Sequence, residues 1–216
     1  MIKYKKGKIY MLEELEKLIN FIQKEYMEFN EKWQKSNYYS KINFKKNLIC
    51  DLLSNEVLLE TIFNYREFIN ENNIQLLIDF KQFNSEISKV NIRAKTKNSI
   101  EYKIKNYNEN HENGKIPIEK CLNDLFGIRI ICSQKLNYDE IQNFIKEKHK
   151  KLKCIDSSKK DYKATHIYFK QDNFNFQWEL QIWNKEDETN NINSHEKYKQ
   201  EYVKWEKENK GGEKRW

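Results

Sequence analysis

The apolar residues change their spacing part-way along the chain. Up to about residue 88 they recur every three or four positions, which is typical of amphipathic helices. After a turn signal at 113–117, which holds the single proline, short runs rich in β-branched and aromatic residues replace them. Because 216 residues suffice for one sizeable core, the two patterns predict one mixed α/β domain with appended helices rather than two independent folds.

The spacing also predicts the order of the elements. We expect helices over residues 11–34, 42–68 and 74–87, although Phe80 and Phe83 would also suit a strand. Strands are expected over 127–132, 164–170 and 174–182, with helices over 137–149 and from 186 to about 208. The last helix could pair between subunits or fold back on the core. We therefore divide the chain into an N-terminal helical region (1–88), a core (89–209) and a flexible tail (210–216).

Charge and cysteine content narrow the class of protein. The net charge of +7 favours phosphate-bearing partners such as nucleotides or RNA, although the lysine surplus could equally reflect biased codon usage. The four cysteines lack the spacing of a metal site, so we expect them to be reduced and buried. Neither a signal peptide nor an apolar run long enough for a bilayer is evident, which predicts a cytoplasmic protein without a membrane partner.

Two groups of residues could hold phosphates and a metal ion. Arg93 and Lys95 precede Ser99 and Lys103 at an expected strand-to-helix junction, where a helix N-terminus also favours anions. Asp124 stands just before a strand whose Gly127 would permit a close backbone approach, and a carboxylate at a rigid strand edge suits Mg²⁺. Taken alone, the first group would better suit a solvated basic helix start, and Asp124 a turn or capping acid.

Two further groups lie later in the chain. Strand alternation sends Glu179 and Gln181 to one face of the sheet, while Trp178, Leu180 and Ile182 take the other. The loop 159–166 is basic and carries an aromatic ring that could stack on a base. Its candidate residues for binding are Lys159, Lys160, Tyr162 and His166.

Taken in order, these groups resemble the motifs of the RelA/SpoT synthetase family. The family motifs run R-x-K-x3-S-x3-K, D-I-A-G-I-R, K-x-x-G-Y-x-S-x-H, E-I-Q-I-R-T and E-H-x-x-Y-K. In this chain they correspond to 93–103, 124–129, 158–166, 179–184 and 194–199. The resemblance covers roughly residues 90–200, and agreement in both order and spacing argues against chance.

The resemblance implies an α+β, nucleotidyltransferase-like fold, with a mixed sheet flanked by helices, and a pyrophosphotransferase activity. Asp124 and Glu179 would be catalytic and hold Mg²⁺, and Glu179 would also orient or deprotonate a ribose 3′-hydroxyl. Tyr162 would stack on the acceptor base. ATP would bind to Arg93, Lys95, Ser99 and Lys103, and the acceptor to Lys159, Lys160, His166 and Gln181. His195 matches a family position that is structural or close to substrate.

The departures from the motifs fall on the acceptor side. The lysine that opens the third motif is Ser158, so the role of Lys159 assumes a shift of one position. Asp161 replaces the glycine before the tyrosine, and Ala164 replaces the serine after it. Trp183-Asn184 replaces the Arg-Thr of the fourth motif, and Ser194 replaces the acid of the fifth. ATP use is therefore better supported than the use of a guanine nucleotide.

Three functions remain open. The acceptor could be GDP or GTP, giving a (p)ppGpp-type alarmone, or the 3′-CCA end of tRNA, as in the toxic branch of small alarmone synthetases. A toxic enzyme would need an antitoxin partner. The third function is a non-catalytic nucleotide- or RNA-binding module. The family's hydrolase half lacks a counterpart here because no His-Asp pair occurs in the sequence.

Overall fold

A five-stranded mixed sheet forms the centre of the molecule. The computed structural model describes residues 2–83, 87–197 and 200. The sheet order is β1-β2-β5-β4-β3, in which only the central pair, β2 and β5, is parallel. The strands are β1 (Ile87–Ala94), β2 (Phe126–Cys132), β3 (Lys153–Asp156), β4 (Thr165–Phe169) and β5 (Trp178–Asn184). The expected mixed sheet flanked by helices, with helices at the N-terminal end, is confirmed.

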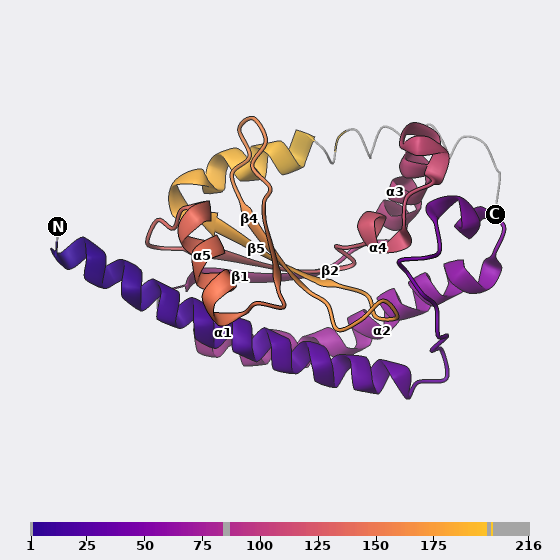
Figure 1. The fold of residues 1–216 in the computed structure, drawn as a ribbon, viewed down its shortest axis with the longest axis horizontal. Helices are drawn as coiled ribbons and strands as arrows, with labels where there is room; N and C mark the ends of the chain where they lie inside the picture. The colour runs from indigo at the N-terminus through magenta and orange to yellow at the C-terminus, as the bar shows by residue number, and fades with distance from the viewer. Residues whose placement is uncertain (1, 84–86, 198–199, 201–216) are drawn as a thin grey trace.

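Two long helices cover one face of this sheet (Figure 1). They are α1 (Ile2–Gln34) and α2 (Glu56–Asp79). The apolar stripe of α1 is buried from Met11 to Trp33, and it packs into the same core cluster as Phe126, Trp178 and Leu180 of the sheet. A buried hydrogen bond from the Tyr26 hydroxyl to the Phe176 carbonyl, 3.0 Å long, fastens α1 to the segment before β5. The N-terminal region and the sheet therefore share one core.

The remaining helices lie at the ends of the sheet and on its opposite face. α3 (Lys97–Asn110) and α4 (Ile118–Cys121) lie between β1 and β2 in the chain, and α5 (Tyr138–Lys148) follows β2. Residues 188–197 are helical and lie over the face opposite α1 and α2 (Figure 1). This part of the expected C-terminal helix folds back onto the sheet. The rest of that helix and the tail 210–216 lie outside the described residues.

Several predicted boundaries were wrong for identifiable reasons. α2 runs through the break expected at 71–73, where the Asn72 side chain donates to the Phe68 carbonyl one turn earlier (2.8 Å). The expected helix 74–87 is therefore the end of α2, followed by the short 3-10 helix η2 (Phe80–Phe83) and the start of β1. Residues 42–48 are not helical, and η1 (Ile49–Leu53) is a 3-10 helix.

The last predicted strand was too long at its start. Residues 174–177 are not part of a strand: the chain bends at 173–175, where the Asp172 carboxylate accepts hydrogen bonds from the Phe174 backbone (2.7 Å) and the Asn175 side-chain amide (2.8 Å). Such a side-chain-capped turn competes with strand pairing.

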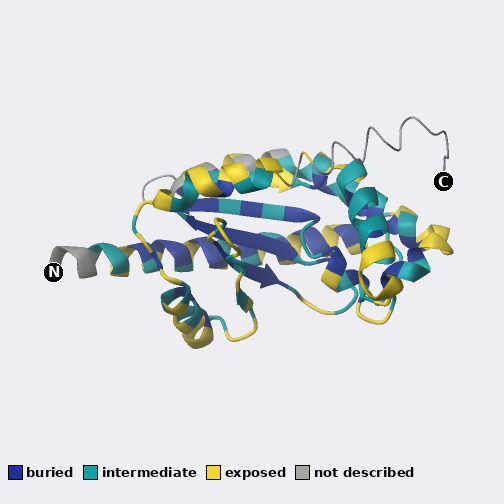
Figure 2. Cartoon of the chain, turned by 90° about the horizontal axis from the view of Figure 1, so that it is seen from above, coloured by how far each residue is buried: buried dark blue, intermediate teal, exposed yellow. Residues whose placement is uncertain are grey.

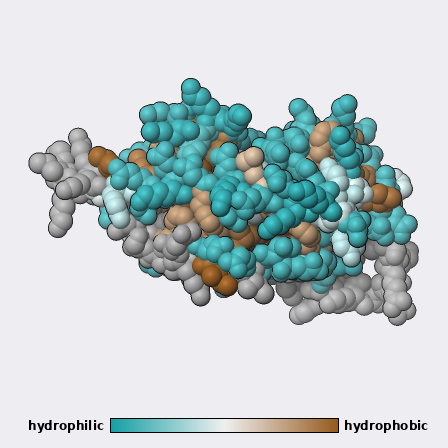
Figure 3. Space-filling model, turned by 90° about the horizontal axis from the view of Figure 1, so that it is seen from below, coloured by the Kyte–Doolittle hydropathy of each residue, from teal (hydrophilic) through white to brown (hydrophobic). Residues whose placement is uncertain are grey.

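The sheet separates buried apolar residues from a polar face. Figure 2 shows strands that are mostly buried, with exposed residues concentrated on loops and outer helix faces. Seen from below, the outer surface is largely hydrophilic, with small apolar areas (Figure 3). Among the described helices, none combines the length and the low charge required to cross a bilayer.

Candidate active site

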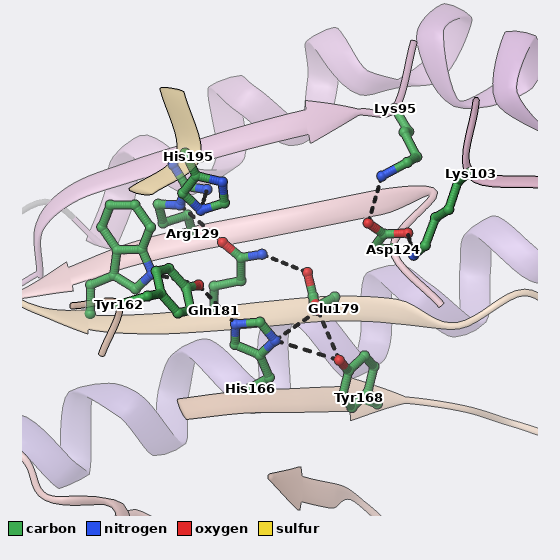
Figure 4. Close-up of polar contacts among 11 residues, drawn as sticks. Lys95, Lys103, Asp124, Arg129, Tyr162, His166, Tyr168, Glu179, Gln181 and His195 are labelled. Atoms are coloured by element: carbon green, nitrogen blue, oxygen red, sulfur yellow. Dashed lines mark hydrogen bonds and ion pairs between the residues drawn. The ribbon is translucent and has the colours of Figure 1, made fainter. Parts of the chain in front are cut away.

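Strand alternation places the candidate site on the sheet face opposite α1 and α2. Trp178, Leu180 and Ile182 are buried in the main core, whereas Glu179 and Gln181 point the other way, as predicted. The register of the central pair sets Gly127 beside Glu179 and Arg129 beside Gln181. Two groups of polar side chains gather here, one at the end of β1 and one along β5 (Figure 4).

The first group joins two lysines to one aspartate. Lys95 Nζ lies 2.7 Å from Asp124 Oδ2, and Lys103 Nζ lies 3.0 Å from Oδ1. All three side chains are less than one-fifth exposed. A backbone hydrogen bond from Lys95 to the Leu125 carbonyl (2.9 Å) ties the end of β1 to the start of β2. This tie brings Asp124 within reach of residues that precede it by about 20 to 30 positions.

The electrostatics of this group follow from its burial. Burial alone would raise the pKa of Asp124, but Lys103 and Lys95 outweigh that effect and hold the pKa well below its usual range. Burial lowers the pKa of Lys95, and Asp124 only partly offsets this. The group is therefore a buried carboxylate neutralised by two ammonium groups, with excess positive charge.

The other two residues predicted to bind ATP lie close by. Arg93 is exposed on β1, opposite Gly127, and its charge contributes to lowering the pKa of Lys95. Ser99 lies in the first turn of α3, where its backbone N–H donates to the N-cap Thr96 (3.3 Å) and its hydroxyl accepts from the Thr96 hydroxyl (2.8 Å). The structure thus gathers the four predicted residues around one end of the sheet.

The second group is centred on Glu179, which is 4% exposed. Its Oε1 lies 2.9 Å from His166 Nδ1 and accepts a hydrogen bond of 2.9 Å from the Tyr168 hydroxyl. Its Oε2 accepts a 2.7 Å hydrogen bond from Gln181. Burial alone would raise the pKa of Glu179, but the hydrogen bond and charge of His166 lower it below its usual value despite repulsion from Asp124. Glu179 is therefore held ionised and fixed in orientation.

Tyr162 belongs to an aromatic cluster beside this group. Its hydroxyl lies 3.1 Å from His166 Nε2 and accepts from the Trp183 indole N–H (3.3 Å). Its ring meets those of Trp183 and His195 edge-on, at centroid distances of 5.9 and 5.4 Å. Burial raises the pKa of Tyr162 to about 12, so the phenol stays protonated near neutral pH. The predicted acceptor residues Tyr162, His166 and Gln181 thus lie together.

The two predicted lysines of the acceptor loop lie farther out. Lys159 and Tyr162 exchange backbone hydrogen bonds of 2.9 Å, which closes a tight turn with Lys160 and Asp161 at its tip. Lys160 adopts a positive φ of 51° there. Both lysine side chains are exposed, so they lie at the rim and not against Glu179.

Arg129, Tyr168 and Trp183 were not predicted as site residues. The Arg129 guanidinium lies 3.9 Å above the Trp183 ring, and its Nε donates to the side-chain oxygen Oε1 of Gln181 at 3.0 Å. Arg129 Nη2 lies 3.1 Å from His195 Nε2, so the helix 188–197 is connected to the site through this side chain. The alternation that placed Glu179 and Gln181 on one face also applies to Arg129 and to Tyr168, and could have identified them.

We expected Gly127 to allow another part of the backbone to approach closely, but no such close approach is present at this position in the described part of the chain. A Cβ atom at this position would lie 4.0 Å from both the Arg93 carbonyl oxygen and Glu179 Oε2, which is ordinary contact. Because the glycine lacks a side chain, there is room for about one methyl group beside Glu179 Oε2.

The chain matches a known protein family. A family profile described as "Region found in RelA / SpoT proteins" matches residues 92–202. Small alarmone synthetase 1 from Bacillus subtilis, bound to its product pppGpp, aligns with 67% of this chain and 83% of its own, at 22% identity and a TM-score of 0.40. A GTP pyrophosphokinase family protein from Streptococcus pneumoniae aligns with 66% of this chain and 77% of its own, at 21% identity and a TM-score of 0.41. No curated protein matches the sequence. Since the family profile spans half of the chain, including both groups of site residues, the protein belongs to the RelA/SpoT family.

Proposed function

We propose that this protein is an ATP-dependent pyrophosphotransferase that moves the β,γ-pyrophosphate of ATP to the ribose 3′-hydroxyl of GDP or GTP. The observation that carries the proposal is the pairing of two groups on one sheet face: Lys95 and Lys103 around Asp124, and three donors around Glu179. The first group suits a triphosphate and the second suits a hydroxyl that must lose a proton.

The donor side follows from the charge of the first group. Asp124 provides one negative charge for Lys95 and Lys103, and Arg93 adds a third cation nearby. A triphosphate would give these groups the negative charge that the protein supplies only in part. Phosphate oxygens would then replace Asp124 as partners of the lysines, with the first turn of α3 and Ser99 as further donors.

The residues also fit Mg²⁺. Asp124 and Glu179 offer hard oxygen ligands on one face, and Mg²⁺ typically takes one or two carboxylates together with substrate phosphates. The described residues contain no group of three or more His, Cys, Asp or Glu side chains that could hold a metal by themselves, which agrees with a site completed by substrate. When bound, Mg²⁺ would neutralise charge on the phosphates and the leaving group.

The reaction forms one bond and breaks one. The acceptor 3′-oxygen bonds to the β-phosphorus, and the bond from that phosphorus to the oxygen bridging to the α-phosphate breaks. AMP leaves with the bridging oxygen. The proton of the 3′-hydroxyl passes to the Glu179 carboxylate, which its donors keep ionised. Tyr162 and His166 would contact the acceptor base and ribose, and the exposed Lys159 and Lys160 its phosphates.

The test is an acceptor panel. Purified protein is incubated with Mg²⁺, γ-labelled ATP and, separately, GDP, GTP, ATP or bulk tRNA. We expect label in a guanine nucleotide and an equal amount of AMP. Glu179→Gln should lower the rate by about 10²- to 10⁴-fold while a folded control, Glu196→Gln on the outer helix, retains it. The absence of label in every acceptor would overturn the proposal.

A second candidate acceptor is the 3′ end of tRNA. The observation that favours it is Trp183, which stands where the family motif has arginine and forms an aromatic cluster with Tyr162 and His195. This exchange removes a cation that could hold acceptor phosphates. Trp183 itself is 1% exposed and is covered by Arg129 and His195, so the half-buried Tyr162 of this cluster would be the ring that meets a base. A chain acting on tRNA would block translation and would need a neutralising partner.

The same panel separates the two acceptors. Label that enters intact tRNA, but does not enter tRNA whose 3′-terminal ribose was oxidised with periodate beforehand, would identify the RNA end as the acceptor. Label confined to GDP or GTP would exclude it.

A further inference from the structure

The two oxygens of the Glu179 carboxylate have unequal surroundings. Oε1 receives both His166 Nδ1 and the Tyr168 hydroxyl at 2.9 Å, whereas the described residues give Oε2 one donor, Gln181, at 2.7 Å. A carboxylate oxygen has two lone-pair directions. Oε1 is therefore saturated by protein, and Oε2 keeps one direction for another partner.

The hydrogen-bond directions around His166 support this assignment. Its Nε2 lies 3.1 Å from the Tyr162 hydroxyl, and its Nδ1 faces Glu179. Whether the ring is charged, with protons on both nitrogens, or neutral, with Tyr162 donating to Nε2, the proton on Nδ1 points at Oε1. The Tyr168 hydroxyl lies 3.5 Å from Nδ1 but only 2.9 Å from Oε1, so its single proton goes to the carboxylate.

On the side of Glu179 that faces β2, the neighbouring residue has no side chain. Gly127 is the register partner of Glu179 on the adjacent parallel strand. A Cβ built there would lie 4.0 Å from Oε2. The side of the carboxylate that faces β2 is thus kept clear, whereas the side that faces β4 is filled by Tyr168, the partner of Glu179 in the antiparallel register.

From this asymmetry we infer that Tyr168 is a positioning residue, whose hydroxyl fills Oε1 together with His166 and leaves Oε2 as the oxygen that meets the acceptor hydroxyl or a metal ion. The inference rests on the proposed function for what Oε2 does, but not for how the carboxylate is held. Tyr168 is 7% exposed, and its hydroxyl lies 2.9 Å from a carboxylate oxygen that can only accept, so Tyr168 is the donor in this hydrogen bond.

The first test measures the carboxylate directly. Tyr168→Phe removes one oxygen and leaves the ring in place. Because a donor to a carboxylate stabilises its charged form, we expect the pKa of Glu179, followed by carboxyl ¹³C NMR, to rise by about one unit. 3-Fluorotyrosine at position 168, a stronger donor, should shift it in the opposite direction while preserving packing.

The matched control is Tyr26→Phe. Tyr26 is equally buried and its hydroxyl is also hydrogen-bonded, but it lies on the other face of the sheet. This variant should leave the Glu179 titration unchanged. Equal titration curves for wild type and both Tyr168 variants would overturn the inference, and this readout needs no enzymatic activity. The titration therefore tests the positioning role of Tyr168, whereas the label-transfer assay tests the proposed function, and either can fail without the other.

Kinetics give a second readout. If label is transferred, Tyr168→Phe should lower kcat about tenfold at neutral pH and leave KM for ATP unchanged. The acidic limb of the pH–rate profile should move to higher pH by the same amount as the Glu179 pKa measured by NMR. A loss of stability with no movement of that limb would identify Tyr168 as structural only and reject the positioning role.

Discussion

Lys95 holds Asp124 through an ion pair of 2.7 Å, and Lys103 holds the other oxygen of the same carboxylate. The residues expected to bind ATP are thus paired with the residue expected to bind metal. To bind ATP, the two lysines would have to give up Asp124 as their partner, and Asp124 would have to give up the lysines to bind a metal ion. The charges that stabilise the free protein are therefore the same charges that would bind substrate.

Replacement of Asp124 by Asn should therefore destabilise the free protein. The change keeps the shape but leaves two buried ammonium groups without a carboxylate, which we expect to lower the free energy of unfolding by about 3 kcal/mol. Urea denaturation measures this effect. The control is Glu67→Gln, which removes the exposed partner of Arg66 and should change stability by about 0.5 kcal/mol or less. Equal stability of Asp124→Asn and wild type would contradict the role assigned to the ion pairs.

The same carboxylate should govern acid stability. The folded pKa of Asp124 lies below that of an unfolded aspartate, about 3.9, so its contribution is present above this pH and is lost as the pH falls toward the folded value. Wild type should lose up to about 1.4 kcal/mol more per pH unit below pH 4 than Asp124→Asn. Unfolding midpoints of wild type and Asp124→Asn are measured at pH 5, 4 and 3. If the stabilities of the two proteins fall in parallel with pH, the prediction is wrong.

Two glycines should respond to alanine in opposite ways. Gly127 has room for a methyl group, so Gly127→Ala should keep or raise stability by about 0.5–1 kcal/mol while lowering activity, because the methyl occupies the space beside Glu179 Oε2. Gly114 has a φ of +74°, and a Cβ there would lie 2.5 Å from the Asn108 side chain. Gly114→Ala should therefore unfold at lower temperature. Thermal unfolding combined with the label-transfer assay tests both, and a destabilised but fully active Gly127→Ala would refute the first expectation.

The contact between His195 and Trp183 should hold the outer helix against the sheet. His195→Ala removes the ring stacked on Trp183 at 5.6 Å and the partner of Arg129. Backbone amides of 188–197 should then exchange faster with deuterium, while those of α1 should not. Glu196→Ala, at the exposed neighbouring position, serves as the control. Unchanged exchange in His195→Ala would show that Asn191, which bonds the Lys163 backbone, suffices to hold the helix.

The central strands were well predicted because their side chains alternate strongly. The runs around Ile128, Ile167 and Leu180 correspond to β2, β4 and β5, and α5 corresponds to the helix expected over 137–149. β3 was missed because its four residues, Lys153 to Asp156, form a short edge strand without a buried face. β1 was expected only as a strand leading into the junction near Arg93, without bounds, because Val90 and Ile92 are the only apolar residues that alternate with polar ones there; Ile87 alone overlaps the helix expected over 74–87.

The sequence predicted only part of the candidate site. Motif order selected Asp124 and Glu179 as candidates, and it also contains Arg129, which strand alternation could have added together with Tyr168. The contacts that these side chains and Trp183 make between strands depend on the register, which the sequence does not give. The exposed position of Lys159 depends on a tight turn that the sequence does not signal with glycine.

The parallel pairing of β2 with β5 has a consequence for how this enzyme can diverge. Backbone hydrogen bonds, rather than loops, fix Gly127 next to Glu179, so the position of the Glu179 carboxylate does not depend on the loop residues around it. The exchanges at Asp161, Ala164 and Trp183 all lie outside that pair of positions. Under the proposed function, substitutions at such positions would change the acceptor preference while the pairing of Gly127 with Glu179, and with it the chemistry, is retained.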